Sequence, residues 1–404
     1  MNQTYDITII GGGIVGTATA LSILKEEKVK LLLLESESSL AAHQTGNNSG
    51  VIHSGLYYKP VSLKATNCTT GREMMYTFCE ENKVQFDRCG KIVVATNKEE
   101  IPALNMLEER GRSNGLIGIR RLSASEIKEY EPHASGVDGL FVPQTGIVDY
   151  VAVTNKYADL IRNNGGEIKL SSKLISVKRD VKDLILFTEH GEYRTKFVVN
   201  CAGLQSDRIA TMFGVDPQLQ IIPFRGEYYK LKKEKQYLVK NLIYPVPDPQ
   251  FPFLGVHFTR MINGGVEAGP NAVLAFKREG YKKTDFSFRD ILEMKLYPGF
   301  WKMAAKYYKM GFQEFRRSFS KELFVKSLQK LIPEIQNDDI EVGGAGVRAQ
   351  ALERDGKLVD DFRIVEAERM VHVLNAPSPA ATASLSIGKT ISEMVINRFN
   401  EEVK

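Results

Sequence analysis

A short segment near the N-terminus has the residue types and spacing of a turn that binds phosphate groups. Gly11, Gly13 and Gly16 form a GxGxxG pattern directly after the apolar run 5–10, and an alanine- and leucine-rich segment follows. The first glycine of such a unit allows a tight turn from strand to helix, the second lets backbone approach a pyrophosphate, and the third lets helix pack closely on strand. The free N–H groups of the helix start then face the phosphates.

A carboxylate completes this unit. Glu35 follows a second apolar run, 29–34, about twenty residues after the last glycine, where a carboxylate can accept a hydrogen bond from a ribose hydroxyl. The pattern therefore predicts a dinucleotide with an unphosphorylated ribose, as in FAD or NAD. No second unit of this kind occurs, since 343–346 is glycine-rich but lacks the pattern. A single dinucleotide site would hold the redox cofactor itself, which favours a flavin over nicotinamide.

The elements that position this turn can be traced along the chain. The sequence predicts a helix over 146–161 entered at Asp149, a small meander of strands over 167–170, 174–178, 184–188 and 192–195, a buried strand over 197–203 and a helix over 206–213. Sheet is expected over 223–256, basic helices over 277–330, a glycine turn before Arg348, a strand from 371 and a final helix to about 397.

These elements predict an α/β fold. We expect a discontinuous Rossmann-like FAD-binding domain over residues 1–80, 146–212 and 340–404. An α+β substrate domain built on an antiparallel sheet is expected to be inserted over residues 81–145 and 213–339.

Composition narrows the class of protein. The chain has 404 residues, 43% of them hydrophobic, and a net charge of +5, which is ordinary for a globular protein with a sizeable core and gives no reason to expect nucleic acid. Four scattered cysteines without ligand spacing indicate neither a metal site nor a disulfide framework. No run of eighteen apolar residues occurs, and a core strand begins about five residues from the N-terminus, which predicts a cytoplasmic protein or one peripheral to the inner face of a membrane.

The segment 277–330 holds more than the whole excess of positive charge. It has fourteen Lys or Arg and six Asp or Glu, a balance of 14 − 6 = +8. Aromatic and apolar residues lie among the basic ones, namely Phe300, Trp301, Met303, Tyr307, Tyr308, Phe312, Phe315 and Phe319. The pattern suits an anionic membrane surface, and it equally suits a packed pair of helices with a solvated basic face.

Five separated motifs carry a resemblance that covers nearly the whole chain. They lie at 43–60, 223–228, 251–259, 346–350 and 375–382. With the glycine turn they resemble FAD-dependent oxidoreductases of the D-amino-acid oxidase superfamily, and within it the L-2-hydroxyglutarate dehydrogenase/oxidase family. The resemblance implies oxidation of (S)-2-hydroxyglutarate to 2-oxoglutarate, with FAD accepting the hydride. The electrons would pass on to quinone, which the basic, aromatic segment 277–330 favours, or to oxygen. The oligomeric state and any covalent attachment of the flavin are left open.

The turn and the resemblance together give a set of expected FAD contacts. They are Gly11, Gly13, Ile14, Val15, Gly16, Glu35, Ser36, His43, Thr45, Asn48, Ser49, Gly50, Val51, Val177, Ala202, Gly203, Pro377, Ser378, Ala380, Ala381 and Thr382. The small residues, prolines and hydroxyls of 375–384 would suit backbone contact with the flavin end of the cofactor.

The reaction needs a base for the hydroxyl proton, and histidine has a reference pKa of about 6.5, near the operating pH. His257, in the strand-like motif 251–259, is the first choice for this base, and His53 is the second.

A dicarboxylate substrate needs two anion sites, which arginine grips best because its planar fork matches a carboxylate. Arg348 and Arg225 rank above Arg260 for this role, and Tyr57 and Tyr244 could add hydrogen bonds.

Two alternatives remain at this stage. Another member of the superfamily would act on an amino acid or on glycerol 3-phosphate, since 52–55 also resembles such enzymes. A different class of protein would keep the flavin only as a structural element, and would bind a membrane, a partner or RNA through 277–330. A panel of substrates would separate the first alternative from the hydroxy-acid reaction. The second would be favoured if His257→Ala left every turnover unchanged while removal of the 277–330 face abolished binding.

Overall fold

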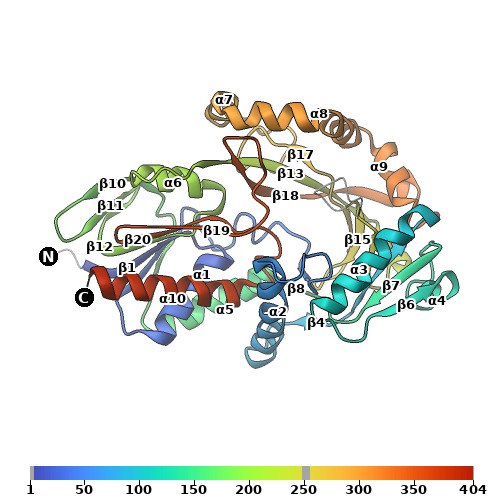
Figure 1. The fold of residues 1–404 in the computed structure, drawn as a ribbon, viewed down its shortest axis with the longest axis horizontal. Coiled ribbons are helices and arrows are strands. Elements are labelled where there is room, and N and C mark those ends of the chain that lie inside the picture. The colour runs from blue at the N-terminus through green and yellow to red at the C-terminus, as the bar shows by residue number, and fades with distance from the viewer. Residues whose placement is uncertain (1–3, 248–254, 404) are drawn as a thin grey trace.

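The computed structural model describes residues 4–247 and 255–403 and arranges them around two large sheets, the first towards the left and the second towards the right of Figure 1. The first sheet has a parallel core in the order β20-β12-β1-β2-β9. Its strands are β1 (Thr4–Ile10), β2 (Leu31–Leu34), β9 (Glu167–Lys169), β12 (Gly191–Asn200) and β20 (Met370–Asn375). Antiparallel strands extend it, namely β10 (Leu174–Arg179), β11 (Leu184–Thr188) and β19 (Arg363–Ala367).

The register of the parallel core sets the position of the candidate site. Ile10 at the end of β1 pairs with Leu34 of β2 on one side and with Asn200 of β12 on the other. The three strands therefore end at the same level, and the residues that follow them meet at one sheet edge. Ligands of open α/β sheets bind at this carboxyl edge.

Helices cover one face of the first sheet. The helices α1 (Ile14–Glu26), α5 (Tyr150–Asn163) and α10 (Ser384–Glu402) pack together there, and α2 (Leu63–Glu81) packs on α10 (Figure 1). Ile9, Leu33 and Phe197 are completely buried beneath them. The short helices η2 (Gly203–Gln205) and α6 (Ser206–Met212) follow β12.

The second sheet runs in the order β17-β13-β16-β15-β14-β5-β7-β6, with β18 along the other edge of β13, and only its β14–β5 pair is parallel. Its strands are β5 (Lys91–Ala95), β6 (Arg120–Ser123), β7 (Asp138–Val142), β13 (Leu219–Leu231), β14 (Leu242–Pro245), β15 (His257–Arg260), β16 (Val266–Gly269), β17 (Val273–Leu274) and β18 (Ile340–Glu353). A three-stranded sheet, β3 (Val51–Ile52), β8 (Gly146–Val148) and β4 (Phe86–Asp87), is also present.

Helices also accompany the second sheet. They are η1 (Lys98–Glu100), α3 (Ile101–Ser113), α4 (Ala124–Tyr130), η3 (Lys233–Leu238), α7 (Phe288–Leu296), α8 (Pro298–Phe319), α9 (Lys321–Leu328) and η4 (Asn337–Asp339). The helix α8 contacts β17 and β18 and lies along one edge of the molecule (Figure 1, orange). Within the described residues, no helix is long and apolar enough to cross a bilayer.

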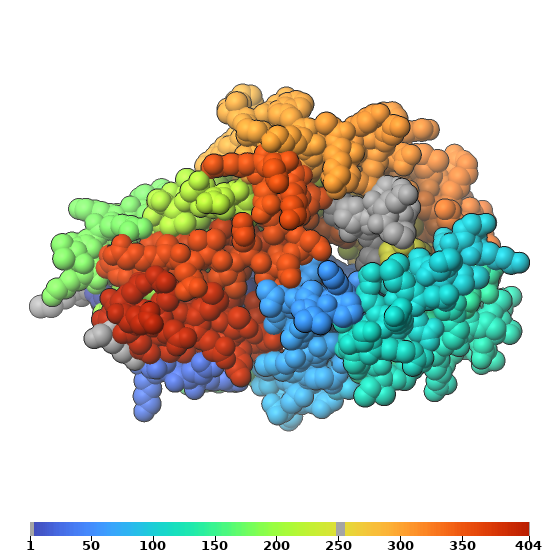
Figure 2. Space-filling model, viewed as in Figure 1, coloured from blue at the N-terminus to red at the C-terminus, as the bar shows by residue number. Residues whose placement is uncertain are grey.

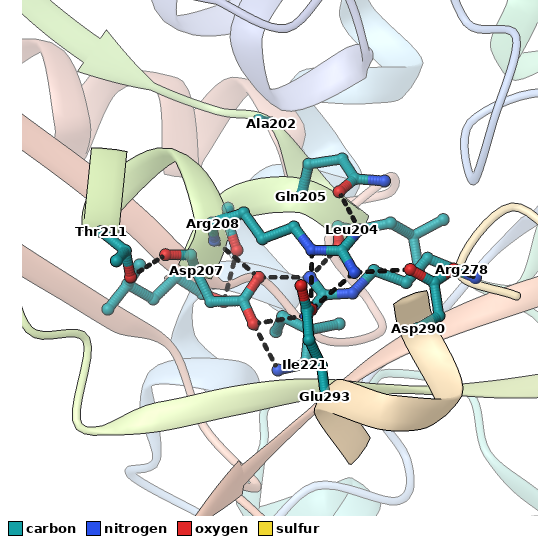
Figure 3. Close-up of polar contacts among 12 residues, drawn as sticks. Ala202, Leu204, Gln205, Asp207, Arg208, Thr211, Ile221, Arg278, Asp290 and Glu293 are labelled. Atoms are coloured by element: carbon teal, nitrogen blue, oxygen red, sulfur yellow. Dashed lines mark hydrogen bonds and ion pairs between the residues drawn. The ribbon is translucent and has the colours of Figure 1, made fainter. Parts of the chain in front are cut away.

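A buried network of ion pairs connects the two halves (Figure 3). Arg278, which precedes α7, donates to both carboxylate oxygens of Asp207 in α6 and to the carbonyl of Leu204. Arg208 of α6 donates to Asp290 and Glu293 of α7. Because Arg278 and Asp207 are almost fully buried, this pair joins the segment before α7 to α6 in the interior of the protein.

Several local expectations are confirmed and others are wrong. Asp149 does cap a helix, since its carboxylate accepts the Val151 N–H, but 146–148 is the strand β8 and the helix begins at Tyr150. Residues 277–287 are not helical, and 192–200 is one continuous strand. Arg348 does not follow a turn, because the glycines before it lie inside β18. For 146–148, 192–200 and 340–353, a partner strand distant in sequence decides the conformation, and local sequence does not show that partner.

The predicted domain bounds stay a prediction. One segment is notable, because β18 (340–353) pairs along its length with β13 and so lies in the second sheet, although we expected 340–404 in the nucleotide-binding domain. The chain returns to the first sheet at β19 and β20.

Candidate active site

The glycine turn has the geometry that a bound pyrophosphate requires. Gly11 has φ +113°, and a Cβ there would lie 2.4 Å from the Cys201 carbonyl oxygen. A Cβ on Gly16 would lie 2.1 Å from the Gly11 oxygen, so helix α1 packs against the turn with no room for a side chain. Gly13 caps α1 without a side-chain hydrogen bond and lines the cavity described below. The helix start is therefore accessible to an anion.

Glu35 lies at the end of β2, and its carboxylate is held in place from two sides. One oxygen accepts the Gly12 N–H at 2.6 Å, and the other accepts the Glu37 N–H at 2.9 Å and the Ser36 hydroxyl at 3.0 Å. The residue is 7% exposed and lines the same cavity as Gly13. The carboxylate is thus fixed next to the turn, as recognition of a ribose requires.

A cavity of about 1580 Å³ runs from this turn to the second sheet. Most of the expected cofactor contacts line it, namely Gly11, Gly13, Ile14, Val15, Glu35, Ser36, His43, Thr45, Asn48, Ser49, Val51, Ala202, Gly203, Pro377, Ser378, Ala380, Ala381 and Thr382. His53, Tyr57, Tyr244, His257 and Arg348 line its other part. The structure therefore brings the expected cofactor and substrate residues to one continuous space.

Five of the expected residues do not line the cavity. Gly16 and Gly50 serve close backbone packing, and Val177 lies on β10. Arg225 is 5% exposed and donates to Glu227 at 2.9 and 3.1 Å and to the Lys282 carbonyl at 3.1 Å.

Arg260 likewise has partners of its own. Its guanidinium donates to the Asp87 carboxylate at 2.5 Å and to the Asn241 side chain at 3.2 Å. Both arginines therefore have protein partners, and we do not propose either as a substrate clamp.

The imidazole of His257 is held in one orientation. Its Nδ1 lies 3.0 Å from the Gly255 carbonyl oxygen, which can only accept, so Nδ1 carries the hydrogen and Nε2 keeps a lone pair. The ring stacks on Tyr244 with centroids 3.9 Å apart. Burial is the largest cause that lowers the pKa of His257 to about 4; the Gly255 bond opposes it, and the charges of Arg348 and Lys91 add to it. The imidazole is therefore neutral at neutral pH.

His53 shares this environment. Burial lowers its pKa to about 3, with contributions from Lys91, His257 and Arg348. Its backbone N–H donates to the Thr382 hydroxyl at 3.0 Å, and this bond holds His53 against the turn before α10. Since the same charges act on both imidazoles, His53 and His257 lie at the same end of the cavity.

Arg348 supplies positive charge at that end. It lies in β18 opposite Phe224 of β13 and lines the cavity. Its charge opposes the effect of burial on Tyr228, whose pKa is nonetheless raised to about 12. A neutral imidazole, a guanidinium and neutral phenols thus lie at one end of the cavity, an arrangement that can bind an anion and accept a proton.

Three functional candidates were missed in the sequence. Tyr228 and Tyr150 line the cavity, and the Tyr150 hydroxyl donates to the Val51 carbonyl at 2.9 Å. Lys91 is buried behind Tyr57 and Tyr244. A lysine at the head of the apolar run 92–95 was the available signal, because such runs form buried strands in which lysine is rare.

Comparison with known proteins shows the family of this chain. Residues 6–394 match the DAO family, described as FAD dependent oxidoreductase. An L-2-hydroxyglutarate dehydrogenase of Indibacter alkaliphilus is 57% identical over 98% of this chain and 100% of that protein, and a mitochondrial L-2-hydroxyglutarate dehydrogenase of Bos taurus is 46% identical over 98% and 90%. A reduced L-alpha-glycerophosphate oxidase from Mycoplasma pneumoniae with FAD bound has a similar fold, with a TM-score of 0.80, 22% identity and coverage of 98% and 95%.

The fold and the site therefore define a flavin-dependent enzyme. The chain belongs to the DAO family of FAD dependent oxidoreductases. The glycine cradle, in which a Cβ would meet backbone atoms, and the fixed Glu35 carboxylate fit the pyrophosphate and ribose of FAD. When bound, FAD supplies the acceptor for the hydride.

Proposed function

We propose that this enzyme oxidises (S)-2-hydroxyglutarate to 2-oxoglutarate. The observation that carries the proposal is the pairing of a neutral histidine, whose Nε2 has a lone pair, with the charge of Arg348 at one end of an FAD-sized cavity. The two relatives named above, which are similar over nearly their whole lengths, bear names that specify this substrate.

The chain's own residues have distinct tasks in this reaction. Arg348 binds a substrate carboxylate and orients the C–H bond that breaks. His257 Nε2 accepts the hydroxyl proton while the carbon loses a hydride, so the alcohol becomes a ketone and two electrons leave the substrate. A bound dianion adds negative charge beside the imidazole, which raises the pKa of His257 above its value in the free site and helps it hold the proton.

The first experiment is an anaerobic reduction of the purified yellow protein. Addition of (S)-2-hydroxyglutarate should bleach the absorbance of the oxidised flavin, and the (R) enantiomer should not. If the yellow protein stays oxidised with 2-hydroxyglutarate but bleaches with glycerol 3-phosphate or an amino acid, the proposed substrate is wrong and the family assignment stands. Flavin content measured in parallel separates a wrong substrate from an empty protein.

We further propose that the electrons leave to a lipid-soluble quinone at a membrane surface. On α8, Trp301, Tyr308, Phe312 and Phe319 lie at intervals of seven, four and seven residues, which places them on one face of the helix. They are 57%, 65%, 66% and 76% exposed, respectively. Figure 2 shows α7 and α8 (orange) as the upper rim of the molecule. Exposed aromatic residues on an amphipathic helix suit the boundary between lipid headgroups and acyl chains.

Basic residues flank this stripe and favour anionic lipid. Lys302, Lys306, Lys309 and Arg316 are exposed on the same helix. Lys302 and Lys306 also line the cavity, so the helix lies between the proposed lipid surface and the site. A packed helical pair would bury its aromatic face, whereas the buried residues of α8 are Gly299, Met303 and Ser318.

Co-sedimentation with vesicles tests this part of the proposal. The holoenzyme should pellet with vesicles that contain anionic lipid at low ionic strength, and much less with neutral vesicles or high salt. Phe312→Ser combined with Phe319→Ser should abolish pelleting, while Val181→Ser, which removes an exposed valine elsewhere, should not. An enzyme that stays in the supernatant and forms one peroxide per substrate would instead use oxygen.

A further inference from the structure

Lys91 is a buried cation that has no task in the reaction proposed above. It is the first residue of β5 and is 2% exposed, and its ammonium makes no ion pair or hydrogen bond with any residue of 4–247 or 255–403. Its ammonium lies 4.2 Å from the centroid of the Tyr57 ring and 5.0 Å from that of Tyr244. Burial of an ammonium without an anion is costly, and an anion that binds nearby in the cavity would lower this cost.

Tyr57 connects this cation to the cavity. The Tyr57 side chain lines the cavity, and its buried hydroxyl has no hydrogen-bond partner among the described residues. A buried hydroxyl without a partner is unfavourable, and a ligand that accepts its hydrogen bond would remove that cost. The Tyr57 hydroxyl is therefore a hydrogen-bond donor, and the Lys91 ammonium on the face of the Tyr57 ring adds positive charge next to it.

The charge balance of the proposed substrate gives this pair a role. A dicarboxylate brings two negative charges, and the two cations that act on both His53 and His257 are Arg348 and Lys91. Arg225 and Arg260 have protein carboxylates of their own. We propose that Lys91 and Tyr57 form the second carboxylate subsite, in which Tyr57 donates to the carboxylate and Lys91 supplies its counter-charge through the phenol ring. This inference rests on the proposed function and names the feature that makes the site selective for a dianion.

The decisive measurement compares two ligands that differ by one carboxylate. We would titrate the oxidised holoenzyme with 2-oxoglutarate and with 2-oxopentanoate, following the flavin spectrum, in wild type, Lys91→Met, Tyr57→Phe and the control Lys98→Met. Lys98 is exposed and follows the same strand, so its loss should change neither affinity. Lys91→Met and Tyr57→Phe should each weaken 2-oxoglutarate by about tenfold or more and 2-oxopentanoate by less than about threefold. Equal weakening of both ligands would mean a structural role and would overturn the inference.

A measurement on the wild type keeps the inference testable if Lys91→Met does not fold. Burial lowers the pKa of Lys91 to about 7, so the ammonium is present below that pH and is lost above it. The preference for 2-oxoglutarate over 2-oxopentanoate should therefore fall between pH 6 and pH 9. The groups around Lys91 stay unchanged in this range, because the Cys68 thiol and both phenols have raised pKas and His53 and His257 have lowered ones. A preference independent of pH would contradict the inference.

Failure of this inference can be told apart from failure of the proposed function. If (S)-2-hydroxyglutarate reduces the wild type and the Lys91→Met variant keeps the preference for the dianion, the proposed function stands and the proposed subsite is wrong. A wild type that binds no dicarboxylate loses both. Partial rescue of the dianion preference by Lys91→Arg, which restores charge with a different shape, would separate the effect of charge from that of packing.

Discussion

The two ends of the cavity are built in opposite ways. The nucleotide end is built from one continuous stretch, 11–16, whose glycines offer backbone groups and leave no side chain in the way. The carboxylate of Glu35 is fixed beside it. At the substrate end, His53, His257 and Arg348 come from segments far apart in the chain and provide side chains. A site made of closely packed backbone has no room for an added side-chain atom. A site made of side chains can lose one of them and still fold, but it then loses the chemistry of that side chain. Damage to the first end should therefore abolish cofactor binding, and damage to the second should leave a yellow but slow enzyme.

The largest effect is expected from Gly11→Ala. A Cβ at Gly11 would clash with the Cys201 carbonyl at 2.4 Å, and its φ of +113° is unfavourable for any other residue. We expect a protein without FAD and with a strongly lowered melting temperature, measured by flavin absorbance and by thermal unfolding. Gly311→Ala is the matched control, because nothing lies within 4 Å of a Cβ in that helical position, and it should be neutral or stabilising by about 1 kcal/mol. A yellow Gly11→Ala protein would contradict the clash.

His257→Asn should separate chemistry from cofactor binding. Loss of the general base should slow flavin reduction by roughly 10² to 10⁴-fold in rapid-mixing measurements, with normal FAD content. His190→Asn changes an exposed histidine and should leave the rate unaltered. His53→Asn should be measured beside it. If this variant loses more of the flavin reduction rate than His257→Asn does, His53 and not His257 is the base.

The network that connects the two halves of the molecule, and with them the two ends of the cavity, can be broken at Arg278. Arg278→Met would leave the carboxylate of Asp207 buried without its guanidinium, and removal of one partner of a buried pair costs about 3 to 5 kcal/mol. Urea unfolding should show this loss, while the exposed control Arg162→Met should change stability by less than about 0.5 kcal/mol. A wild-type unfolding midpoint for Arg278→Met would mean that the network in Figure 3 does not hold the halves together.

The contrast between the ends also explains what sequence could predict. The turn, Glu35 and the strands around them were found because their spacing is local and their partners follow in order. At the other end, the histidines and Arg348 were identified by a resemblance. Arg225 was ranked as a substrate clamp, although Glu227 lies two residues on in the same strand, and therefore on the same face, and binds it. Lys91 was missed because its significance depends on Tyr57 and Tyr244, which only the folded sheet brings to it.

The pH dependence of kcat/KM gives the smallest effect and the finest test of the substrate end. This quantity reports the pKas of the free enzyme, and burial lowers the pKa of His257 to about 4. The base is therefore unprotonated from pH 5 to 6.5, where kcat/KM should stay nearly constant, whereas a solvated histidine of pKa about 6.5 would reduce it roughly thirtyfold at pH 5.

Arg348→Met should move the acid limb to higher pH, because it removes a positive charge that lowers the pKa of His257. It should also raise KM, since a carboxylate partner is lost. FAD content should not change, because Arg348 lies at the substrate end of the cavity. An acid limb near pH 6.5 in the wild type would mean that water reaches the imidazole, and the dry, cationic environment inferred for this end would then be wrong.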